Sequence, residues 1–259
     1  MPILPYLEIP IVKHCNLNCK YCSHLANVEK PYFMSLERFE KDLRRMAELF
    51  SDVTELRLLG GEPLLHPEIG ACRKIARKIF PCTLLKVVTN GVLIPAMKGD
   101  VMEEISSCDV CFDISLYPPT QKIEPLIRRK LYDYGVRFYL SDLIESFGRR
   151  LLAEPLSDPL KAWEDCRTKN CFVLFEGKIS YCYAPQVAAM AEKKFGHPFD
   201  MGKSLADIYD GELTGESLLA FLRRPHECCA YCGVPETCAW SLSDREPKLS
   251  DWLVDKPIR

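Results

Sequence analysis

The sequence predicts an α/β fold, a parallel β-sheet with helices between its strands, followed by a small cysteine-rich domain. Strand-like apolar runs alternate with helical periodicity from residue 6 to about residue 140. Repeated β-α units of this length build parallel sheets, either open or curled into a barrel. Beyond about residue 146 the rhythm is lost and cysteines become frequent. We therefore expect one domain at residues 1–145 and a second at residues 146–259.

The elements of the first domain are expected in regular alternation. Tyr6–Val12 has the period-two pattern of a strand, and Ser35 is expected to cap a helix whose apolar stripe extends from Leu36 to Phe50. Further strands are expected at 55–59, 84–89, 110–116 and 136–140, and further helices at 69–79, 97–106 and 126–134. Active sites in such sheets lie at the carboxyl ends of the strands.

The strand expected at 110–116 alternates in an informative way. Val110, Phe112, Ile114 and Leu116 share one face, whereas Cys111, Asp113, Ser115 and Tyr117 share the other. Buried parallel strands are normally apolar on both faces. A polar inner face therefore predicts a lined cavity.

The second domain is expected to contain little regular structure. A hairpin at 172–181 turns at Glu176-Gly177, and short helices are expected near 205–209 and 216–222. Such sparse structure cannot bury a core of its own, so we expect bound metal to hold it together.

Composition excludes several classes of protein. The chain has 259 residues, of which 47% are hydrophobic and 27% charged, as in a globular protein. Its net charge of −2 predicts neither a nucleic-acid nor a membrane partner. No apolar run approaches the ~20 residues that span a bilayer, and the amino terminus has no secretory signal. A cytoplasmic protein is expected.

The 14 cysteines are far more than packing requires. In a reducing compartment, clustered thiols are more often metal or cluster ligands than disulfides. Cys15, Cys19 and Cys22 follow the first strand at spacings of three and two residues. Three thiolates can hold three irons of a [4Fe–4S] cube and leave the fourth iron open. The alternative is a zinc site completed by His14 or His24.

This C-x3-C-x2-C pattern, with the aromatic Tyr21 before its last cysteine, resembles the radical S-adenosylmethionine (SAM) superfamily. The resemblance implies an incomplete (β/α)6 barrel over residues 1–145. It also implies that Cys15, Cys19 and Cys22 hold a cluster whose open iron is chelated by SAM. One electron from the cluster then cleaves SAM to methionine and a 5′-deoxyadenosyl radical, which abstracts a substrate hydrogen. Tyr21 is expected beside the cofactor.

Three further segments resemble SAM-binding motifs of that superfamily. Gly60-Gly61-Glu62-Pro63, at the end of the second strand, is similar to the GGEP motif that holds the methionine amino group. Thr89 and Asn90 resemble the strand end that lines the SAM site, although plain turn chemistry is the alternative. Ser115 matches a serine that contacts ribose, whereas Tyr117 stands where many members carry aspartate.

The carboxy-terminal half resembles the auxiliary-cluster domains of the superfamily. Ten residues separate Cys166 from Gly177, four more lead to Cys182, and Cys229-x2-Cys232-x5-Cys238 follows. Leu242 occupies the position of the next cysteine of the full SPASM pattern, so the resemblance implies the shorter twitch form with one auxiliary [4Fe–4S] cluster. Its expected ligands are Cys166, Cys182, Cys229 and Cys232, with Cys171 competing with Cys166. A four-thiolate zinc site is the alternative.

The remaining cysteines have simpler interpretations. Cys72 and Cys82 are expected to be packing residues, as is the Cys108/Cys111 pair. Cys228 and Cys238 are spare thiols near the expected cluster. Cys238 is the candidate catalytic residue, a hydrogen-atom donor to a substrate radical, because the arrangement resembles certain radical SAM sugar epimerases.

The substrate expectation depends on a further resemblance. Lys13-His14-Cys15-Asn16-Leu17-Asn18-Cys19 and Ser115-Leu116-Tyr117-Pro118 resemble segments of proteins that accompany glycosyltransferases in surface-polysaccharide pathways. The expected activity is hydrogen abstraction from a sugar, cyclitol or nucleotide-sugar carbon, leading to oxidation or epimerisation, with a flavodoxin- or ferredoxin-type reductant. A maturase of ribosomally made peptides is the alternative. Such an enzyme is expected to need a peptide-recognition domain before the barrel, or a separate protein that supplies one. A non-catalytic zinc or iron–sulfur module is the alternative of another class.

Overall fold

The computed structural model describes residues 1–28 and 30–259, and the chain divides into two compact units. The first unit comprises residues 1–16 and 32–145, and the second comprises residues 17–31 and 146–259. Most of the loop that carries the C-x3-C-x2-C motif therefore belongs to the second unit. Cys15 belongs to the first unit, whereas Cys19 and Cys22 belong to the second.

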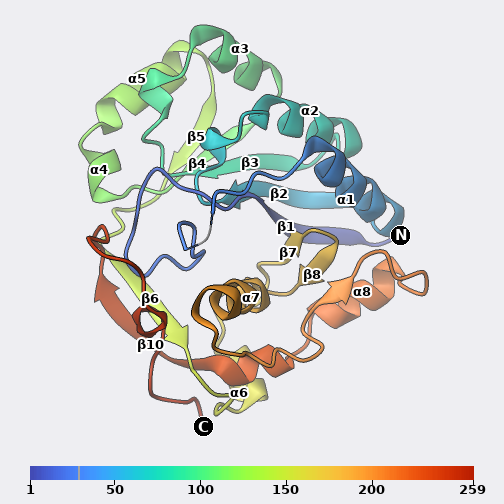
Figure 1. Ribbon diagram of the computed structural model, residues 1–259. Helices are drawn as coiled ribbons and strands as arrows, with labels where there is room; N and C mark the ends of the chain where they lie inside the picture. Colours follow the sequence, from blue (N-terminus) through green and yellow to red (C-terminus); the bar gives the residue numbers. More distant parts are fainter. Residues whose placement is uncertain (29) are drawn as a thin grey trace. The chain divides into compact units, whose positions relative to one another are not determined.

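A parallel sheet forms the centre of the first unit, as the sequence predicts. Its strands lie in the order β5-β4-β3-β2-β1, and each neighbouring pair is parallel. Figure 1 shows α1, α2, α3 and α5 together on one side of this sheet. The strands are β1 (Ile3–Val12), β2 (Asp52–Gly60), β3 (Leu84–Thr89), β4 (Cys111–Ile114) and β5 (Arg137–Leu140). The helices are α1 (Leu36–Leu49), α2 (Ile69–Ile79), α3 (Gly99–Ser107), α4 (Pro118–Gln121) and α5 (Glu124–Asp133), with 3-10 turns η1 (Pro63–Leu65) and η2 (Ile94–Ala96).

Helix α1 shows how local sequence sets the boundaries of an element. The Ser35 hydroxyl accepts a hydrogen bond from the Arg38 N–H at 3.2 Å, which satisfies one of the unpaired donors of the first turn. Phe39, Leu43 and Met46 recur at helical spacing and are buried. The predicted cap and the predicted apolar stripe are both confirmed.

The two faces of the sheet differ in chemistry. Leu7, Ile9, Leu56 and Leu58 lie on one face and are fully or almost fully buried. Along β4 the alternation predicted from the sequence is confirmed, since the apolar set is buried and the set containing Asp113 is half-buried. The half-buried face carries charged side chains on β1, β2, β3 and β4, and these are described with the site below.

The second unit contains more regular structure than the sequence predicts. Its strands are β6 (Ser146–Leu151), β7 (Val173–Phe175), β8 (Lys178–Ser180), β9 (Ala206–Asp207) and β10 (Cys232–Ala239). Its helices are α6 (Pro159–Glu164), α7 (Ala184–Phe195) and α8 (Gly215–Leu222), with 3-10 turns η3 (Glu227–Tyr231) and η4 (Leu249–Asp251). Strand β6 pairs antiparallel with β10, and β8 pairs antiparallel with β7 and β9.

The β7–β8 hairpin is confirmed where the sequence places it. Its turn residues Glu176 and Gly177 have φ angles of 48° and 77°. Positive φ at both central residues is the requirement of a type I′ hairpin turn, which glycine meets without strain. Helix α8 also forms where a short helix is expected.

Two expectations for this unit are wrong. The segment near 205–209 is not a helix, because Ala206 and Asp207 form β9 and the Asp207 carboxylate accepts a hydrogen bond from Lys178 Nζ at 2.8 Å. Helix α7 was not expected at all. Its buried side is built from Gln186, Ala188, Met190 and Ala191, too few large apolar residues to give a clear stripe in the sequence.

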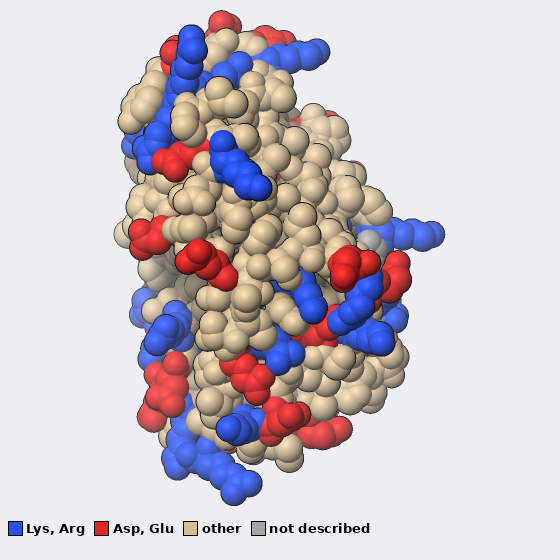
Figure 2. All heavy atoms as spheres, turned by 90° about the vertical axis from the view of Figure 1, so that its left-hand side faces the viewer, with Lys and Arg blue, Asp and Glu red and all other residues tan. Residues whose placement is uncertain are grey.

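The charged surface agrees with the near-neutral composition. Figure 2 shows acidic and basic side chains interspersed over one face, and the whole chain has a net charge of −2. Across residues 1–28 and 30–259, no helix is both long and apolar enough to cross a membrane. The absence of nucleic-acid and membrane partners stays a prediction.

Candidate functional site

We call the loop that follows β1 and carries Cys15, Cys19 and Cys22 the cysteine loop. The Gly60-Gly61 loop at the end of β2 lies directly against the backbone that leads into it. The N–H of Gly61 donates to the Val12 carbonyl at 2.8 Å, and the N–H of Glu62 donates to the His14 carbonyl at 2.8 Å. A Cβ atom on Gly60 or Gly61 would come within 2.0 Å of a backbone oxygen, and Gly60 has φ of 134°. Only glycine permits this close approach of two backbone segments.

Glu62 is fully buried and joins the ends of β2 and β3. Its Oε1 accepts hydrogen bonds from the Thr89 hydroxyl at 2.6 Å and the Leu64 N–H at 3.0 Å, and its Oε2 accepts from the Asn90 N–H at 2.8 Å. Burial raises the pKa of Glu62 to about 7, although these three donors oppose the shift. A carboxylate has about four acceptor sites, so Glu62 retains capacity for one further donor.

Asn90 extends the connection to the first cysteine. Its Nδ2 donates to Asn16 Oδ1 at 2.7 Å and lies 3.6 Å from Cys15 Sγ. The Ser115 N–H donates to the Thr89 carbonyl at 2.9 Å. The first unit therefore brings together, at the carboxyl edge of its sheet, most of the residues predicted to serve the cofactor: Cys15, Gly60, Gly61, Glu62, Pro63, Thr89, Asn90 and Ser115.

The rest of the cysteine loop has an environment suited to thiolate ligands. The backbone N–H groups of His24, Leu25 and Ala26 donate to the Cys22 sulfur and oppose the increase in its pKa that burial causes. Burial, followed by the nearby Cys22, raises the pKa of Cys19 to about 11, while the Trp240 indole opposes this increase. Such N–H donors stabilise a thiolate bound to metal.

The other residues singled out in this loop are held by aromatic contacts. Tyr21 has a φ of 64°, and the charged ends of Lys20 and Arg149 lie 5.0 and 5.3 Å from its ring centre. The His24 ring packs on Tyr183 with a centroid separation of 4.3 Å. Every one of the 14 cysteines is free of disulfide bonds, so the thiols of the motif are available as soft ligands. These donors fit an iron–sulfur cluster.

A second group of thiols lies within the second unit, and we call Cys166, Cys182, Cys228, Cys229 and Cys232 the C-terminal thiol group. The Cys228 thiol forms hydrogen bonds with Cys182 and Cys229, and the bond to Cys182 contributes most to raising its pKa to about 12. Burial raises the pKa of Cys232 to about 12, with smaller contributions from the nearby thiols of this group. The members come from three segments that are distant in the sequence.

Polar side chains border this thiol group. The Tyr181 hydroxyl lies 2.7 Å from Cys229 Sγ, and the His226 N–H donates to the same sulfur at 3.5 Å. Arg150 Nη1 is 4.0 Å from Cys166 Sγ. Crowded, buried thiols resist ionisation, and a bound metal cluster would remove that penalty by accepting the thiolates. In the described part of the chain no three His, Cys, Asp or Glu side chains converge as ligands on one ion.

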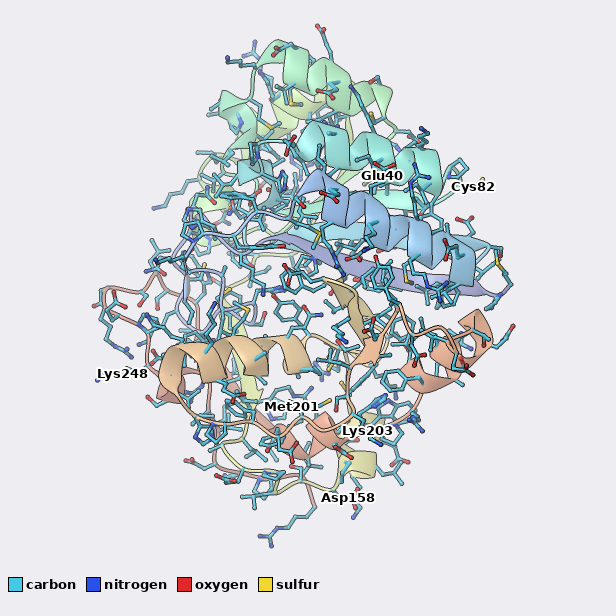
Figure 3. The ribbon with its side chains drawn as sticks, turned by 45° about the vertical axis from the view of Figure 1, so that its right-hand side comes forward. Glu40, Cys82, Asp158, Met201, Lys203 and Lys248 are labelled. Atoms are coloured by element: carbon cyan, nitrogen blue, oxygen red, sulfur yellow. The ribbon has the colours of Figure 1, made fainter. Side chains whose placement is uncertain are left out.

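The remaining cysteines occupy different environments. Cys171 is half-buried in the turn after Thr168, and Cys238 is half-buried on β10 opposite Phe147. Cys72 is fully buried on α2, as expected for a packing residue. The same expectation is wrong for Cys82, which is exposed at the margin of the first unit (Figure 3) because it lies in the turn that precedes β3.

Sequence reasoning missed a network of charged residues on the half-buried face of the parallel sheet. Arg57 lies 2.5 Å from Glu55 and 3.1 Å from Asp113, and Lys86 lies 3.1 Å from Glu55. The Tyr6 hydroxyl donates to Glu8 at 2.5 Å. We call these residues the polar ladder: Tyr6, Glu8, Glu55, Arg57, Lys86 and Asp113. Among these residues, the sequence placed only Asp113 on a polar face of the sheet. It could not show that the other residues lie beside Asp113, because that depends on the register between strands.

Burial affects the ionisation of this network. Burial raises the pKa of Glu8, and the Tyr6 hydroxyl and the Arg57 guanidinium oppose that shift. The carboxylate of Glu55 has a lowered pKa, because its bonds to Arg57 and Lys86 outweigh its burial. The ladder therefore presents fixed charges of both signs on one face of the sheet.

Comparison with known proteins agrees with this arrangement. Residues 9–138 match the family model described as the radical SAM superfamily. The chain is 33% identical over 135 residues to the mitochondrial GTP 3′,8-cyclase of Arabidopsis thaliana, covering 49% of this chain and 33% of that protein. It is 30% identical over 122 residues to the GTP 3′,8-cyclase of Petrotoga mobilis, covering 46% of this chain and 37% of that protein. The chain thus spans about a third of the length of these curated relatives.

One solved structure matches over most of both chains. The crystal structure of BtrN in complex with AdoMet and 2-DOIA aligns with a TM-score of 0.53 and 17% sequence identity. The alignment covers 90% of this chain and 94% of that one. At this level of identity the likeness concerns the fold.

Proposed function

The chain belongs to the radical SAM superfamily, and from that membership we propose that it abstracts a hydrogen atom from a carbon of a sugar, cyclitol or nucleotide sugar, leading to oxidation or epimerisation. The observation that carries the catalytic part is the connection from Glu62 through Asn90 to Cys15. It links the GGEP loop and the end of β3 to the first cysteine of the motif.

The superfamily implies a [4Fe–4S] cluster and SAM, and the residues present fit both. We propose that Cys15, Cys19 and Cys22 hold the cluster. When bound, the cluster and SAM supply a 5′-deoxyadenosyl radical, the species that removes the substrate hydrogen. Burial raises the pKa values of Cys19 and Cys22, and the N–H donors around them partly offset this increase.

The chain's own groups position SAM. The Glu62 carboxylate has one acceptor site left for the ammonium of the methionine moiety. Thr89 and Asn90 hold this Glu62 carboxylate in place. Gly60 and Gly61 let backbone groups approach a ligand closely because they carry no Cβ. Ser115 and Tyr21 stay predictions for the ribose and the cofactor surroundings.

The polar ladder supports a polyhydroxylated substrate. Glu8, Glu55 and Asp113 can accept hydrogen bonds from hydroxyl groups, and Arg57 and Lys86 can donate to them. All of these side chains occupy one half-buried face of the sheet, the face of Cys111 and Asp113 on β4. A sugar or cyclitol offers the matching density of donors and acceptors, whereas the ladder has little apolar surface for an apolar group.

A purine nucleoside triphosphate is the second candidate substrate. The two relatives described above, which align with about half of this chain, are GTP 3′,8-cyclases. However, a triphosphate requires uncompensated cations, and Arg57 and Lys86 are paired with carboxylates. The ladder therefore favours the neutral polyol.

We also propose that residues 146–259 form a twitch-like domain with one auxiliary [4Fe–4S] cluster. Its ligands are drawn from Cys166, Cys182, Cys229 and Cys232, and the contacts of Cys228 add that thiol to the candidates. Cys171 remains the alternative to Cys166. A flavodoxin- or ferredoxin-type protein would supply the electron, in keeping with a cytoplasmic enzyme.

Cys238 is the proposed hydrogen donor if the reaction is an epimerisation. Its S–H would give a hydrogen atom to the substrate radical. One electron from the external reductant and one proton from solvent would then convert the resulting thiyl radical back to the thiol. Replacing Cys238 by Ala should then stop formation of the epimer and leave SAM cleavage intact. Unchanged epimer formation would assign the donor elsewhere.

The test is anaerobic reconstitution, followed by dithionite-driven SAM cleavage with a panel of nucleoside diphosphate sugars, cyclitols and GTP. Roughly eight irons per chain, with 5′-deoxyadenosine released faster when one sugar or cyclitol is present, supports the proposal. Stimulation by GTP alone would move the chain to the cyclase branch, and micromolar binding of a leader peptide would favour a maturase. Zinc binding without SAM cleavage would leave a non-catalytic module.

A further inference from the structure

The segment from Trp240 to Trp252, which we call the C-terminal strap, crosses the cysteine loop within the second unit. The Lys20 N–H donates to the Ser241 carbonyl at 2.9 Å, and the Ser243 N–H donates to the Asn18 carbonyl at 2.6 Å. Between these bonds, Cys19 pairs with Leu242 in an antiparallel bridge. The backbone that carries Cys19 is thus bonded to the strap on both sides of the cysteine.

The end of the strap adds an indole to the loop. The Trp252 Nε1–H donates to the Cys22 carbonyl at 2.9 Å, and the Trp252 ring lies 5.9 Å from that of Phe195 on α7. Trp252 therefore fixes the backbone beside the Cys22 sulfur.

The strap is itself held in shape by an ion pair. The Arg245 guanidinium binds the Asp251 carboxylate through two contacts of 2.5 and 3.0 Å, and the Lys248 N–H donates to Asp251 at 2.9 Å. Asp251 is only 7% exposed. The strap and the cysteine loop enclose a small cavity of about 30 Å³, lined by residues that include Cys19, Cys22 and Trp252.

We propose that the C-terminal strap is a positioning element for the catalytic cluster, which holds the backbone on both sides of Cys19 and fixes the backbone at Cys22 through Trp252. This rests on the proposed binding of that cluster by Cys15, Cys19 and Cys22. A donor to the carbonyl beside a ligating sulfur affects the placement of that ligand.

Loss of the Trp252 indole should therefore loosen the cluster without unfolding the protein. Trp252→Phe should leave the reduction potential of the SAM-binding cluster near the wild-type value. It should accelerate release of that cluster's iron to a chelator by roughly tenfold, the lower end of the effect of outer-shell changes on metal affinity, because the hydrogen bond to the Cys22 carbonyl is lost. The SAM-binding cluster is recognised by the change of its electron paramagnetic resonance signal when SAM is added.

Trp163→Phe is the matched control, because Trp163 lies on α6 and its ring contacts Lys169. This variant should match the wild type in both the potential of the SAM-binding cluster and its rate of iron loss. Circular dichroism of each variant before reconstitution reports any general loss of fold. If the wild type binds no SAM-responsive cluster, the proposed function fails. If it does, and Trp252→Phe and Trp163→Phe lose iron at the same rate, the strap proposal is overturned.

Discussion

The backbone N–H of Asn90 lies 2.8 Å from Glu62 Oε2, while the side-chain amide of the same asparagine lies 3.6 Å from Cys15 Sγ. One residue at the end of β3 therefore contacts both the buried carboxylate of the GGEP loop and the first cysteine. Because the backbone and side-chain contacts of Asn90 are separate, they can be removed separately.

Asn90→Ala should weaken SAM binding by about tenfold, the equivalent of one hydrogen bond of roughly 1.4 kcal/mol. The substitution keeps the N–H that donates to Glu62 and removes the amide that holds Asn16 and faces Cys15. Calorimetry on the anaerobically reconstituted protein measures the change. Thr120→Val is the control, since it removes only the hydrogen bond to the Asn90 carbonyl. Equal loss of affinity in both variants would rule out a specific role for the amide.

Glu62 should make folding stability depend on pH. Its folded pKa is raised from 4.5 to about 7 by burial, so its contribution is fully present below pH 4.5 and is lost as pH rises through 7. The loss should be about 3 kcal/mol, and Glu62→Gln, which does not ionise, should abolish it. Urea unfolding of both apoproteins at pH 5 and pH 8 measures the difference. A wild-type loss equal to that of the variant would contradict the assignment.

SAM binding should release a proton if its ammonium meets Glu62. A cation beside the carboxylate lowers its pKa below about 7, so a fraction of protonated Glu62 ionises on binding near neutral pH. Binding enthalpies measured at pH 6.5 in buffers of different ionisation enthalpy should therefore differ for the wild type. The difference should be absent in Glu62→Gln. Buffer-independent enthalpies in the wild type would place the ammonium elsewhere.

The sequence predicts those structural features that depend on a few residues close together in the chain. The strand ends at Gly60 and Thr89, the cap at Ser35 and the β7–β8 turn each follow from a few neighbouring residues. The polar ladder does not, because Glu8, Arg57 and Asp113 meet only through the register of the four strands β1 to β4. Cys228 was set aside for the same reason, since its contact with Cys182 bridges 46 residues and no spacing rule indicates it.

The assignment of the cysteine loop is the clearest case of information that is absent from local sequence. Residues 17–31 follow the first strand, so they were expected to belong to the first domain. They instead belong to the second unit, where the strap forms backbone hydrogen bonds with Asn18 and Lys20. The strap contains no cysteine or histidine, and its backbone bonds leave no trace in residue type.

Gly61→Ala should destabilise the protein by about 3 kcal/mol or more, since the new Cβ would lie 2.0 Å from the His14 carbonyl oxygen. The backbone contact between the GGEP loop and the cysteine loop would have to open. Gly148→Ala is the matched control, because nothing lies within 4 Å of the Cβ it would add. Urea denaturation compares the two variants. Similar stabilities for both would mean that the contact opens at little cost.

Replacing members of the C-terminal thiol group should remove iron selectively. Cys182→Ser should lower the iron content from roughly eight to roughly four atoms per chain, because one cube of two loses a ligand, while SAM binding persists. Cys228→Ser should lower the iron content to the same level if Cys228 is a ligand. It should keep the wild-type iron content if Cys229 and Cys232 hold the cluster without Cys228. Cys82→Ser is the control, since that thiol is exposed. Eight irons in Cys182→Ser would exclude it as a ligand.

Asp113→Asn should raise the KM of the accepted sugar or cyclitol about tenfold or more and leave SAM cleavage without substrate unchanged. The Asp113 carboxylate lies 3.1 Å from Arg57 on the half-buried face of the sheet, and no hydrogen-bond contact joins it to Glu62, Asn90 or Cys15 among the described residues. An amide at this position accepts weaker hydrogen bonds from substrate hydroxyl groups than a carboxylate does. It also frees Arg57 from one of its two carboxylate partners. Together these changes should cost roughly 1.4 kcal/mol of binding free energy. Steady-state kinetics with 5′-deoxyadenosine as the readout separates the two steps.

Asp109→Asn is the matched control for this change, since Asp109 pairs with Arg137 at 2.6 Å and both side chains are more than half exposed. An exposed ion pair contributes little, so KM should stay at the wild-type value. An Asp113→Asn variant that bound GTP more tightly than the wild type would instead show that the negative charge of the ladder excludes phosphates. An unchanged KM for every compound would place substrate recognition away from this face of the sheet, and the argument for a polyol would lose its structural support.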